Sequence, residues 1–217
     1  ATSMSSSTVN NLSTVLYSVF DFARKQKYID ENFIGDIEFN YKKNTESIHD
    51  TFSESEVAAL WEHSNDENVR IVLIMIYTGL RIEELLSMKC QNVFPENRYM
   101  TGGMKTDAGK DRIIPIARKI LPFVSELYCE GSYLLCHDGR RYSRTLFMQS
   151  IWKPAMQSRK LNHLPHDTRY SCATMMDRAG VNQNCIKEML GHAKKDVTNK
   201  VYIKKSLDDL LKAIDMI

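Results

Sequence analysis

The feature that most constrains the fold is the uninterrupted apolar run from Ile71 to Tyr77, the longest in the chain. It is much shorter than the ~18 apolar residues that a membrane-spanning helix requires. The wider segment 68–78 is typical of a helix that is mostly apolar on all sides, and such a helix has to be buried. Gly79 is placed to end this helix, because glycine readily adopts the left-handed conformation found after helix ends. We therefore expect a globular protein with no membrane span.

The composition agrees with a globular chain. The 217 residues are 43% hydrophobic and 26% charged, and 9 Gly and 5 Pro are too few for a collagen-like or low-complexity protein. Residues 1–11 are rich in Ser and Thr and lack an apolar core, so they do not resemble a secretory signal. The first residue is Ala1 rather than methionine, from which we expect the chain to be part of a longer protein.

The cysteines indicate free thiols in a cytosolic protein, because they are widely spaced and odd in number. They are Cys90, Cys129, Cys136, Cys172 and Cys185, and no pair has Cys-x-x-Cys spacing. A weaker alternative is a metal site formed by His163, His166 and Cys172. A zinc site usually contains a second closely spaced pair of ligands, and the sequence offers none.

Charge is unevenly distributed, although the formal net charge is only +2. Residues 153–205 contain eleven Lys and Arg against four Asp and Glu, whereas residues 46–100 contain four basic and ten acidic residues. A basic segment in a nearly neutral chain fits a face that binds phosphate groups. On charge alone, an ordinary solvated surface is the alternative.

Helical periodicity dominates the chain, which predicts the α+β class: mainly helical, with one small antiparallel sheet. Ser53 and Glu56 form a capping box at the start of a helix that ends near Ser64. Residues 98–105 and 111–116 are expected to pair as a β-hairpin around a turn at 107–110. The other expected helices cover 8–27, 68–78, 81–89, 117–130, 143–159, 166–179, 182–190, 196–203 and 206–216.

Two regions follow from this pattern. One helix over 8–27 cannot bury a core of its own, and residues 28–50 are polar and resemble a linker. We expect residues 1–45 to be the C-terminal part of a small helical domain plus a linker, or an arm packed on the rest. Residues 46–217 are expected to form the second domain, which carries the functional residues and a C-terminal tail helix.

Charged groups stand at two expected helix starts. Arg81 follows Gly79 and Leu80, where its charge opposes the helix dipole. The free N–H groups of a helix start nevertheless form a good anion site together with a guanidinium; a surface pair with Glu84 is the alternative. His166 and Arg169 are three residues apart on one helix face, so both can reach one phosphate group.

The order of the polar motifs resembles the tyrosine recombinases, which are the phage-type integrases. The motifs are Thr78-Gly-Leu-Arg-Ile-Glu-Glu-Leu85, Lys105 in the hairpin, His166-x-x-Arg169, Leu190-Gly-His192 and Tyr202. They cover about residues 50–205 and are similar to those of integrases from Gram-positive conjugative transposons and temperate phages. Thr168, Tyr170 and Ala193 depart from common family residues, and none of them replaces a catalytic position.

This resemblance implies a catalytic set in which Tyr202 is the nucleophile. The full set is Arg81, Lys105, His166, Arg169, His192 and Tyr202. The two arginines and His192 would hold the phosphate oxygens on which charge develops. His166 would orient Tyr202 or take its proton, and Lys105 would protonate the 5′ leaving oxygen.

No metal or other cofactor is expected, because the arginines and the lysine already supply positive charge. Glu84 is expected to anchor Arg81 rather than act as a catalytic acid, and Asp167 is expected to cap the 166–179 helix.

The implied function is that of a site-specific recombinase, or integrase, acting through a 3′-phosphotyrosyl intermediate. It would integrate and excise a mobile element at a double-stranded DNA core site, in the bacterial cytoplasm at the nucleoid, with an accessory directionality factor as a further partner. Two alternatives stay open: a phosphotyrosyl topoisomerase or resolvase, and a catalytically idle DNA-binding module.

The C-terminal tail carries an apolar stripe at helical spacing, formed by Leu207, Leu210, Leu211, Ile214 and Ile217. A helix of about twelve residues is marginal alone, so the stripe has to bury against another surface. Packing on its own domain is one alternative. The family resemblance favours docking on a neighbouring subunit, which would link dimers or tetramers on DNA.

Overall fold

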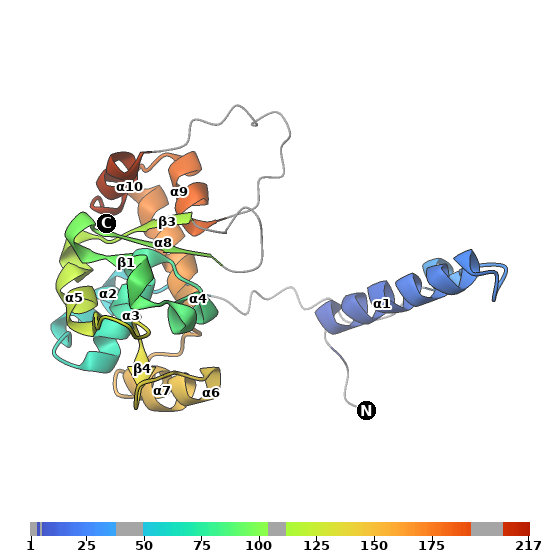
Figure 1. The fold of residues 1–217 in the computed structure, drawn as a ribbon, viewed down its shortest axis with the longest axis horizontal. Helices are drawn as coiled ribbons and strands as arrows, with labels where there is room; N and C mark the ends of the chain where they lie inside the picture. Colours follow the sequence, from blue (N-terminus) through green and yellow to red (C-terminus); the bar gives the residue numbers. More distant parts are fainter. Residues whose placement is uncertain (1–3, 5, 38–49, 104–111, 192–205) are drawn as a thin grey trace. The chain divides into compact units, whose positions relative to one another are not determined.

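The computed structural model describes residues 4, 6–37, 50–103, 112–191 and 206–217. The chain divides into two compact units, residues 1–48 and residues 49–217 (Figure 1). Three predicted catalytic residues, Lys105, His192 and Tyr202, lie outside the described residues, as do the expected hairpin turn and the helix expected over 196–203.

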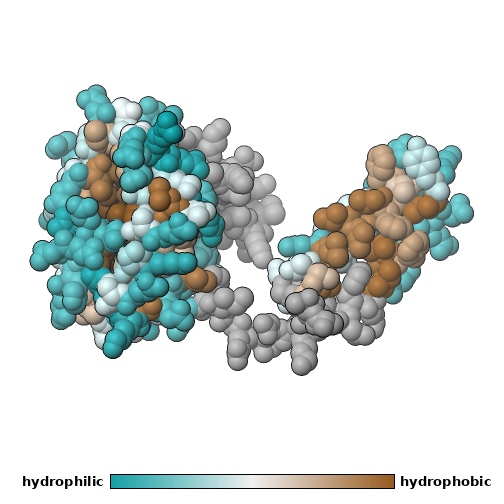
Figure 2. All heavy atoms as spheres, turned by 90° about the horizontal axis from the view of Figure 1, so that it is seen from below, coloured by the Kyte–Doolittle hydropathy of each residue, from teal (hydrophilic) through white to brown (hydrophobic). Residues whose placement is uncertain are grey.

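The first unit contains helix α1, Ser6–Lys25, and a short 3-10 helix η1, Phe33–Asp36. Asn32 joins them, because its side-chain amide donates to the backbone carbonyl of Tyr17 at 3.0 Å. No residue of α1 is buried, and hydrophobic side chains gather on this unit in Figure 2. The exposed apolar residues of α1 are Leu12, Val15, Tyr17, Val19 and Phe22.

The second unit is mostly helical. Its α-helices are α2 Glu54–Glu62, α3 Glu67–Thr78, α4 Ile82–Ser87, α5 Leu121–Leu127, α6 Arg144–Phe147, α7 Lys153–Gln157, α8 Asp167–Arg178, α9 Gln183–Leu190 and α10 Leu207–Ile214. A π-helical segment η5, Met148–Trp152, joins α6 to α7, and 3-10 turns occur at η2 Cys90–Asn92, η3 Pro95–Asn97 and η4 Arg118–Ile120. The expected helix over 143–159 is therefore continuous but changes its hydrogen-bond pattern ahead of Pro154, which has no N–H to donate.

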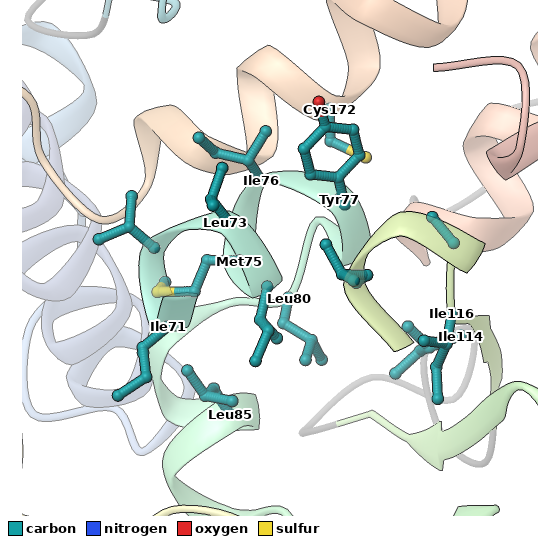
Figure 3. Packing of buried hydrophobic residues seen from close by; sticks show 14 of the residues in the cluster. Ile71, Leu73, Met75, Ile76, Tyr77, Leu80, Leu85, Ile114, Ile116 and Cys172 are labelled. Carbon is teal, nitrogen blue, oxygen red and sulfur yellow. The ribbon is translucent and has the colours of Figure 1, made fainter. Parts of the chain in front are cut away.

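The apolar helix α3 forms the centre of the second unit. Every residue from Ile71 to Thr78 is buried, and α3 packs against α2, α5, α7 and α8. Figure 3 shows Tyr77 of α3 beside Cys172 of α8, and Ile114 and Ile116 belong to the same hydrophobic cluster. Gly79 ends the helix with φ of 61°, so the prediction of a buried helix closed by glycine is confirmed. Among the described residues, no helix is both long and apolar enough to cross a bilayer.

The sheet confirms the α+β class. Strands β1 Val93–Phe94, β2 Tyr99–Gly102 and β3 Arg112–Pro115 are antiparallel in the order β1-β2-β3, with Gly102 opposite Arg112. β2 and β3 lie within the two expected hairpin arms, while β1 was not predicted. A second hairpin, β4 Cys136–His137 and β5 Arg140–Arg141, was also not predicted, because strands of two residues have no alternation to detect.

In the single chain, the tail helix α10 packs on β3 and α9 of its own unit. Leu210, Ala213 and Ile214 are buried there. Asp215 fixes the end of α10, since its carboxylate accepts from Arg98 Nη2 at 2.5 Å and from the backbone N–H of Arg118 at 3.0 Å. Two residues of the apolar stripe, Leu210 and Ile214, are therefore buried within the chain, while Leu207, Leu211 and Ile217 stay partly exposed.

Candidate active site

Arg81 stands at the start of α4, two residues after the glycine that ends α3. It occupies the N-cap position in extended conformation, so it is the last residue before the helix. Its side chain is 40% exposed and its Nη1 donates to Glu84 Oε1 at 3.1 Å. The Arg81 backbone N–H donates to Glu84 Oε2 at 3.0 Å. One carboxylate thus holds both the backbone and the side chain of Arg81.

Glu84 is buried, and each of its two oxygens accepts two hydrogen bonds. Besides the two contacts from Arg81, Arg112 donates from Nη1 to Oε1 and from Nη2 to Oε2, both at 2.8 Å. Burial opposes ionisation of this carboxyl, but the hydrogen bonds and charges of Arg112 and then Arg81 outweigh it and lower the pKa of Glu84 to about 2. Glu84 is therefore ionised at neutral pH and anchors Arg81, in agreement with the role expected for it.

Arg169 lies in the first turn of α8 with its side chain turned into the protein. It is 4% exposed. Its Nη1 donates to the carbonyl of Gly79 at 2.8 Å, and its Nη2 donates to the carbonyl of Leu190. Burial, with the nearby charges of Arg81 and Arg112, lowers the pKa of Arg169 to about 10, so the guanidinium stays charged at neutral pH. A guanidinium has five N–H donors, so two carbonyl contacts leave capacity for an anion.

The C-terminal end of α9 is the element that links the arginines. The last carbonyls of a helix have no partner within it and carry partial negative charge. Arg112 Nε donates to the carbonyl of Met189 at 3.0 Å, and Arg169 binds the carbonyl of the next residue, Leu190. Two guanidinium groups therefore complete this helix end.

His166 is the N-cap residue of α8 and is partly exposed. Its ring makes an edge contact with Tyr170, with 5.1 Å between the centroids. The next residue, Asp167, accepts from the backbone N–H of Leu164 at 2.7 Å. It therefore stabilises the turn that leads into α8, but it is the first residue of the helix and not its cap, so the capping role expected for it is wrong.

The proposed metal ligands are not gathered into one site. His163 stacks on Phe52 at 3.8 Å and faces Glu56, with Nε2 and Oε1 3.3 Å apart. Cys172 is buried in the core, and burial raises the pKa of its thiol to about 12. Within the described ranges, no group of three His, Cys, Asp or Glu residues is arranged to hold a metal ion. The alternative of a site formed by His163, His166 and Cys172 is wrong.

The described part of the site suits the binding of an anion. Three guanidinium groups from α4, β3 and α8 lie around a single carboxylate, so positive charge exceeds negative charge by two. Arg81 lies near enough to Arg169 for its charge to lower the pKa of Arg169, and His166 lies one turn ahead of Arg169 at the start of the same helix. Such a cluster binds a phosphate group better than it binds a neutral ligand.

Arg112 is the one member of this cluster that sequence reasoning missed. The signal was present: Arg112 alternates with the buried Ile114 in an otherwise apolar strand, and a charge at a buried strand position requires a buried partner.

Residues 50–208 match the phage integrase family, and the chain belongs to this family of tyrosine recombinases. The tyrosine recombinase XerA of Pyrococcus horikoshii is 31% identical over 183 residues, which are 80% of this chain and 63% of XerA. The tyrosine recombinase XerD of Staphylococcus aureus strain N315 is 26% identical over 203 residues, or 83% of this chain and 66% of XerD. The chain thus spans about 63% of the length of its archaeal XerA relative.

Solved structures share the fold at low sequence identity. The Tn1549 transposon integrase in complex with circular intermediate DNA has a TM-score of 0.72 at 19% identity, covering 95% of this chain and 78% of that one. A lambda integrase tetramer bound to a Holliday junction has a TM-score of 0.64 at 16% identity, covering 88% of this chain and 60% of that one.

Proposed function

We propose that this protein is a site-specific DNA recombinase that cuts and rejoins strands through a 3′-phosphotyrosyl intermediate. The observation that carries the proposal is the meeting of Arg81 and Arg169 around Glu84, with more positive charge than this acid neutralises. Negative charge on a phosphodiester increases when a nucleophile attacks it, and fixed cations placed where charge develops are the main means of stabilising such a transition state.

In the proposed reaction, the Tyr202 phenol oxygen attacks phosphorus while the bond from phosphorus to the 5′ oxygen breaks. His166 takes or directs the phenol proton, and Lys105 gives a proton to the 5′ oxygen that leaves. Arg81, Arg169 and His192 hold the non-bridging oxygens. The phosphotyrosyl bond retains the energy needed for a 5′ hydroxyl of another strand to reverse the step, so neither a metal nor another cofactor is required.

The biological role is proposed from the relatives. Integration and excision of a mobile element fit the likeness to an integrase bound to circular intermediate DNA. This role would place the protein at the nucleoid in the bacterial cytoplasm, with a directionality factor as an accessory partner. Residues 1–45 would then belong to a helical core-binding domain, whose other helices would cover the exposed apolar face of α1.

Assembly into dimers or tetramers on DNA is part of the same proposal. A tail that passed to a neighbouring subunit would have to leave its packing position on β3 and α9. This would expose Leu210 and Ile214, at a cost of about 1.5–3 kcal/mol for each side chain, and would break the contact between Arg98 and Asp215. Equivalent contacts on the neighbouring subunit would restore both the burial of these side chains and the ion pair.

The test is formation of a covalent adduct with DNA. A pool of nicked suicide duplexes with a randomised core is incubated with the protein in EDTA, and adducts that survive SDS are isolated and sequenced. We expect adducts enriched in one core sequence. Tyr202→Phe should abolish them, while Tyr170→Phe, a matched change at an exposed tyrosine beside His166, should retain them.

Each other outcome has a defined meaning. Adducts without sequence enrichment, together with relaxation of any supercoiled plasmid, would identify a topoisomerase. Binding without adducts would identify an idle DNA-binding module. Adducts retained in Tyr202→Phe would refute the nucleophile, and cleavage that needs added magnesium would refute the metal-free mechanism.

A further inference from the structure

Arg112 is a charged residue in a position that a strand normally fills with an apolar one. It begins β3 opposite Gly102, and its side chain is 4% exposed. A buried guanidinium is costly unless its donors are paired. The groups that pair with the Arg112 guanidinium therefore indicate its structural role.

The partners of Arg112 lie on α4, which begins after Arg81, and on α9, whose end also accepts a hydrogen bond from Arg169. Its fork binds both oxygens of Glu84 at 2.8 Å, and Glu84 holds Arg81. Its Nε binds the Met189 carbonyl at 3.0 Å, one residue before the carbonyl that accepts from Arg169. The two sets of contacts use different N–H groups of one planar guanidinium.

The backbone around this contact is built to allow a close approach. A Cβ on Gly191 would lie 3.0 Å from Arg112 Cδ, so the absence of a side chain lets the Gly191 backbone lie against the Arg112 stem. Close packing of the Arg112 stem on the Gly191 backbone leaves the guanidinium little freedom to shift relative to the end of α9.

We propose that Arg112 is a positioning residue that fixes the distance between the Arg81 and Arg169 guanidinium groups. It acts on Arg81 through Glu84 and on Arg169 through the last turn of α9. The inference rests on the proposed function, because two arginines need a fixed separation only if both bind one phosphate during strand cleavage. Arg112 itself has its donors turned towards Glu84 and Met189 and is not assigned a contact with DNA.

The proposal separates the shape of Arg112 from its charge. Arg112→Lys keeps the positive charge but cannot bind two carboxylate oxygens and a carbonyl with one rigid fork. We expect cleavage at saturating DNA to fall by about 10², the usual effect of misplacing a reacting group by about 1 Å. DNA affinity should change by less than about threefold, because contacts along the phosphate backbone set it.

A second variant tests the same role in case Arg112→Lys does not fold. Arg112→Met combined with Glu84→Gln removes the buried ion pair without leaving either of these buried positions charged. Arg81 loses its ionic partner, but its side chain is 40% exposed and the glutamine oxygen can still accept from it. Arg159→Met is the matched control: Arg159 is a similarly buried arginine, 9% exposed, that pairs with Asp66 at 3.0 Å. We expect slow cleavage in the double variant and normal cleavage in the control.

Hydrogen exchange tests the same link without any DNA chemistry. In Arg112→Lys, the amides of 113, 114 and 116 and those of 189–191 should exchange faster together, by about tenfold or more, because both segments lose one shared anchor. Arg159→Met should leave both segments unchanged.

The outcomes distinguish failure of the positioning role of Arg112 from failure of the proposed recombinase function. Wild-type rates of cleavage in Arg112→Lys or in the folded double variant would overturn the positioning role. So would unchanged exchange at 189–191 in Arg112→Lys, even if the wild-type protein cleaves DNA. If the wild-type protein forms no adduct but exchange changes as expected, Arg112 holds the two segments together and it is the proposed function that fails.

Discussion

Gly79 is the position where one added methyl group should disturb both the core and the site. Its φ is +61°, and a Cβ built there lies 2.4 Å from Leu190 Cδ2 and 3.3 Å from Cys172 Sγ. Leu190 and Cys172 are both buried, so neither can move into solvent. The Gly79 carbonyl also accepts a hydrogen bond from Arg169, so a shift here reaches the guanidinium.

The expected cost of Gly79→Ala has two parts. The left-handed conformation costs an alanine about 1–2 kcal/mol, and forcing a methyl group into a packed core costs about 1–3 kcal/mol. The free energy of unfolding should therefore fall by about 2–5 kcal/mol. Gly180→Ala is the matched control, because Gly180 also follows a helix with positive φ, of +76°, but a Cβ there has no atom within 4 Å.

Urea unfolding followed by tryptophan fluorescence measures this difference. Both tryptophans, Trp61 and Trp152, lie in residues 49–217, so the signal reports this unit alone. We expect Gly79→Ala to lose about 1–3 kcal/mol more than Gly180→Ala, which is the packing part. In a Leu190→Ala background, that excess should shrink. Equal losses for the two glycine variants, or an excess unchanged by Leu190→Ala, would refute the argument.

Two further predictions address catalysis and assembly. Arg169→Ala should lower cleavage at saturating DNA by about 10²–10³ through lost transition-state stabilisation, whereas alanine at Lys194, Lys195 or Lys200 should mainly weaken DNA binding and reduce its salt dependence. Cleavage rate and DNA affinity measured across a salt series distinguish a catalytic from a binding role, and equal losses of rate in the arginine and lysine variants would contradict this assignment. Deleting 206–217 should leave single-site binding intact but weaken assembly on DNA in gel-shift and ultracentrifugation assays, whereas a lower melting temperature with unchanged assembly would show that the tail acts only within its own chain.

The sequence was most informative where the cause of structure is local. The apolar run in α3 predicts burial by itself, and Gly79 and the capping box of Ser53 and Glu56 are signals within a few residues. All three are confirmed. The helix expected over 117–130 ends earlier than predicted. Its α-helical part, α5, ends at Leu127, where no glycine or proline marks the boundary in the sequence.

Contacts between distant segments could not be derived in this way. The sequence shows that Arg112 needs a partner, but only the fold brings Glu84 and the Met189 carbonyl to it. Similarly, the pairing of Arg81 with Glu84 is local and was expected, while the binding of Arg169 to the Gly79 and Leu190 carbonyls depends on how α3, α8 and α9 pack. The catalytic pattern was recognised by its order, and its geometry follows from tertiary packing.

The balance of charge in this cluster fits the reaction proposed for it. Like charges about 4 Å apart repel by about 4 kcal/mol in the partly screened environment near a protein surface, so three guanidinium groups need an acid to hold them together. Glu84 supplies this negative charge and accepts four hydrogen bonds from Arg81 and Arg112. A second acid would halve the remaining charge and weaken phosphate binding. With one acid, a surplus of two positive charges remains, which matches the two negative charges of the phosphorane formed when a phenolate attacks a phosphodiester. The cluster is therefore better matched to the transition state than to the singly charged substrate, which is the condition for faster cleavage rather than tighter binding alone.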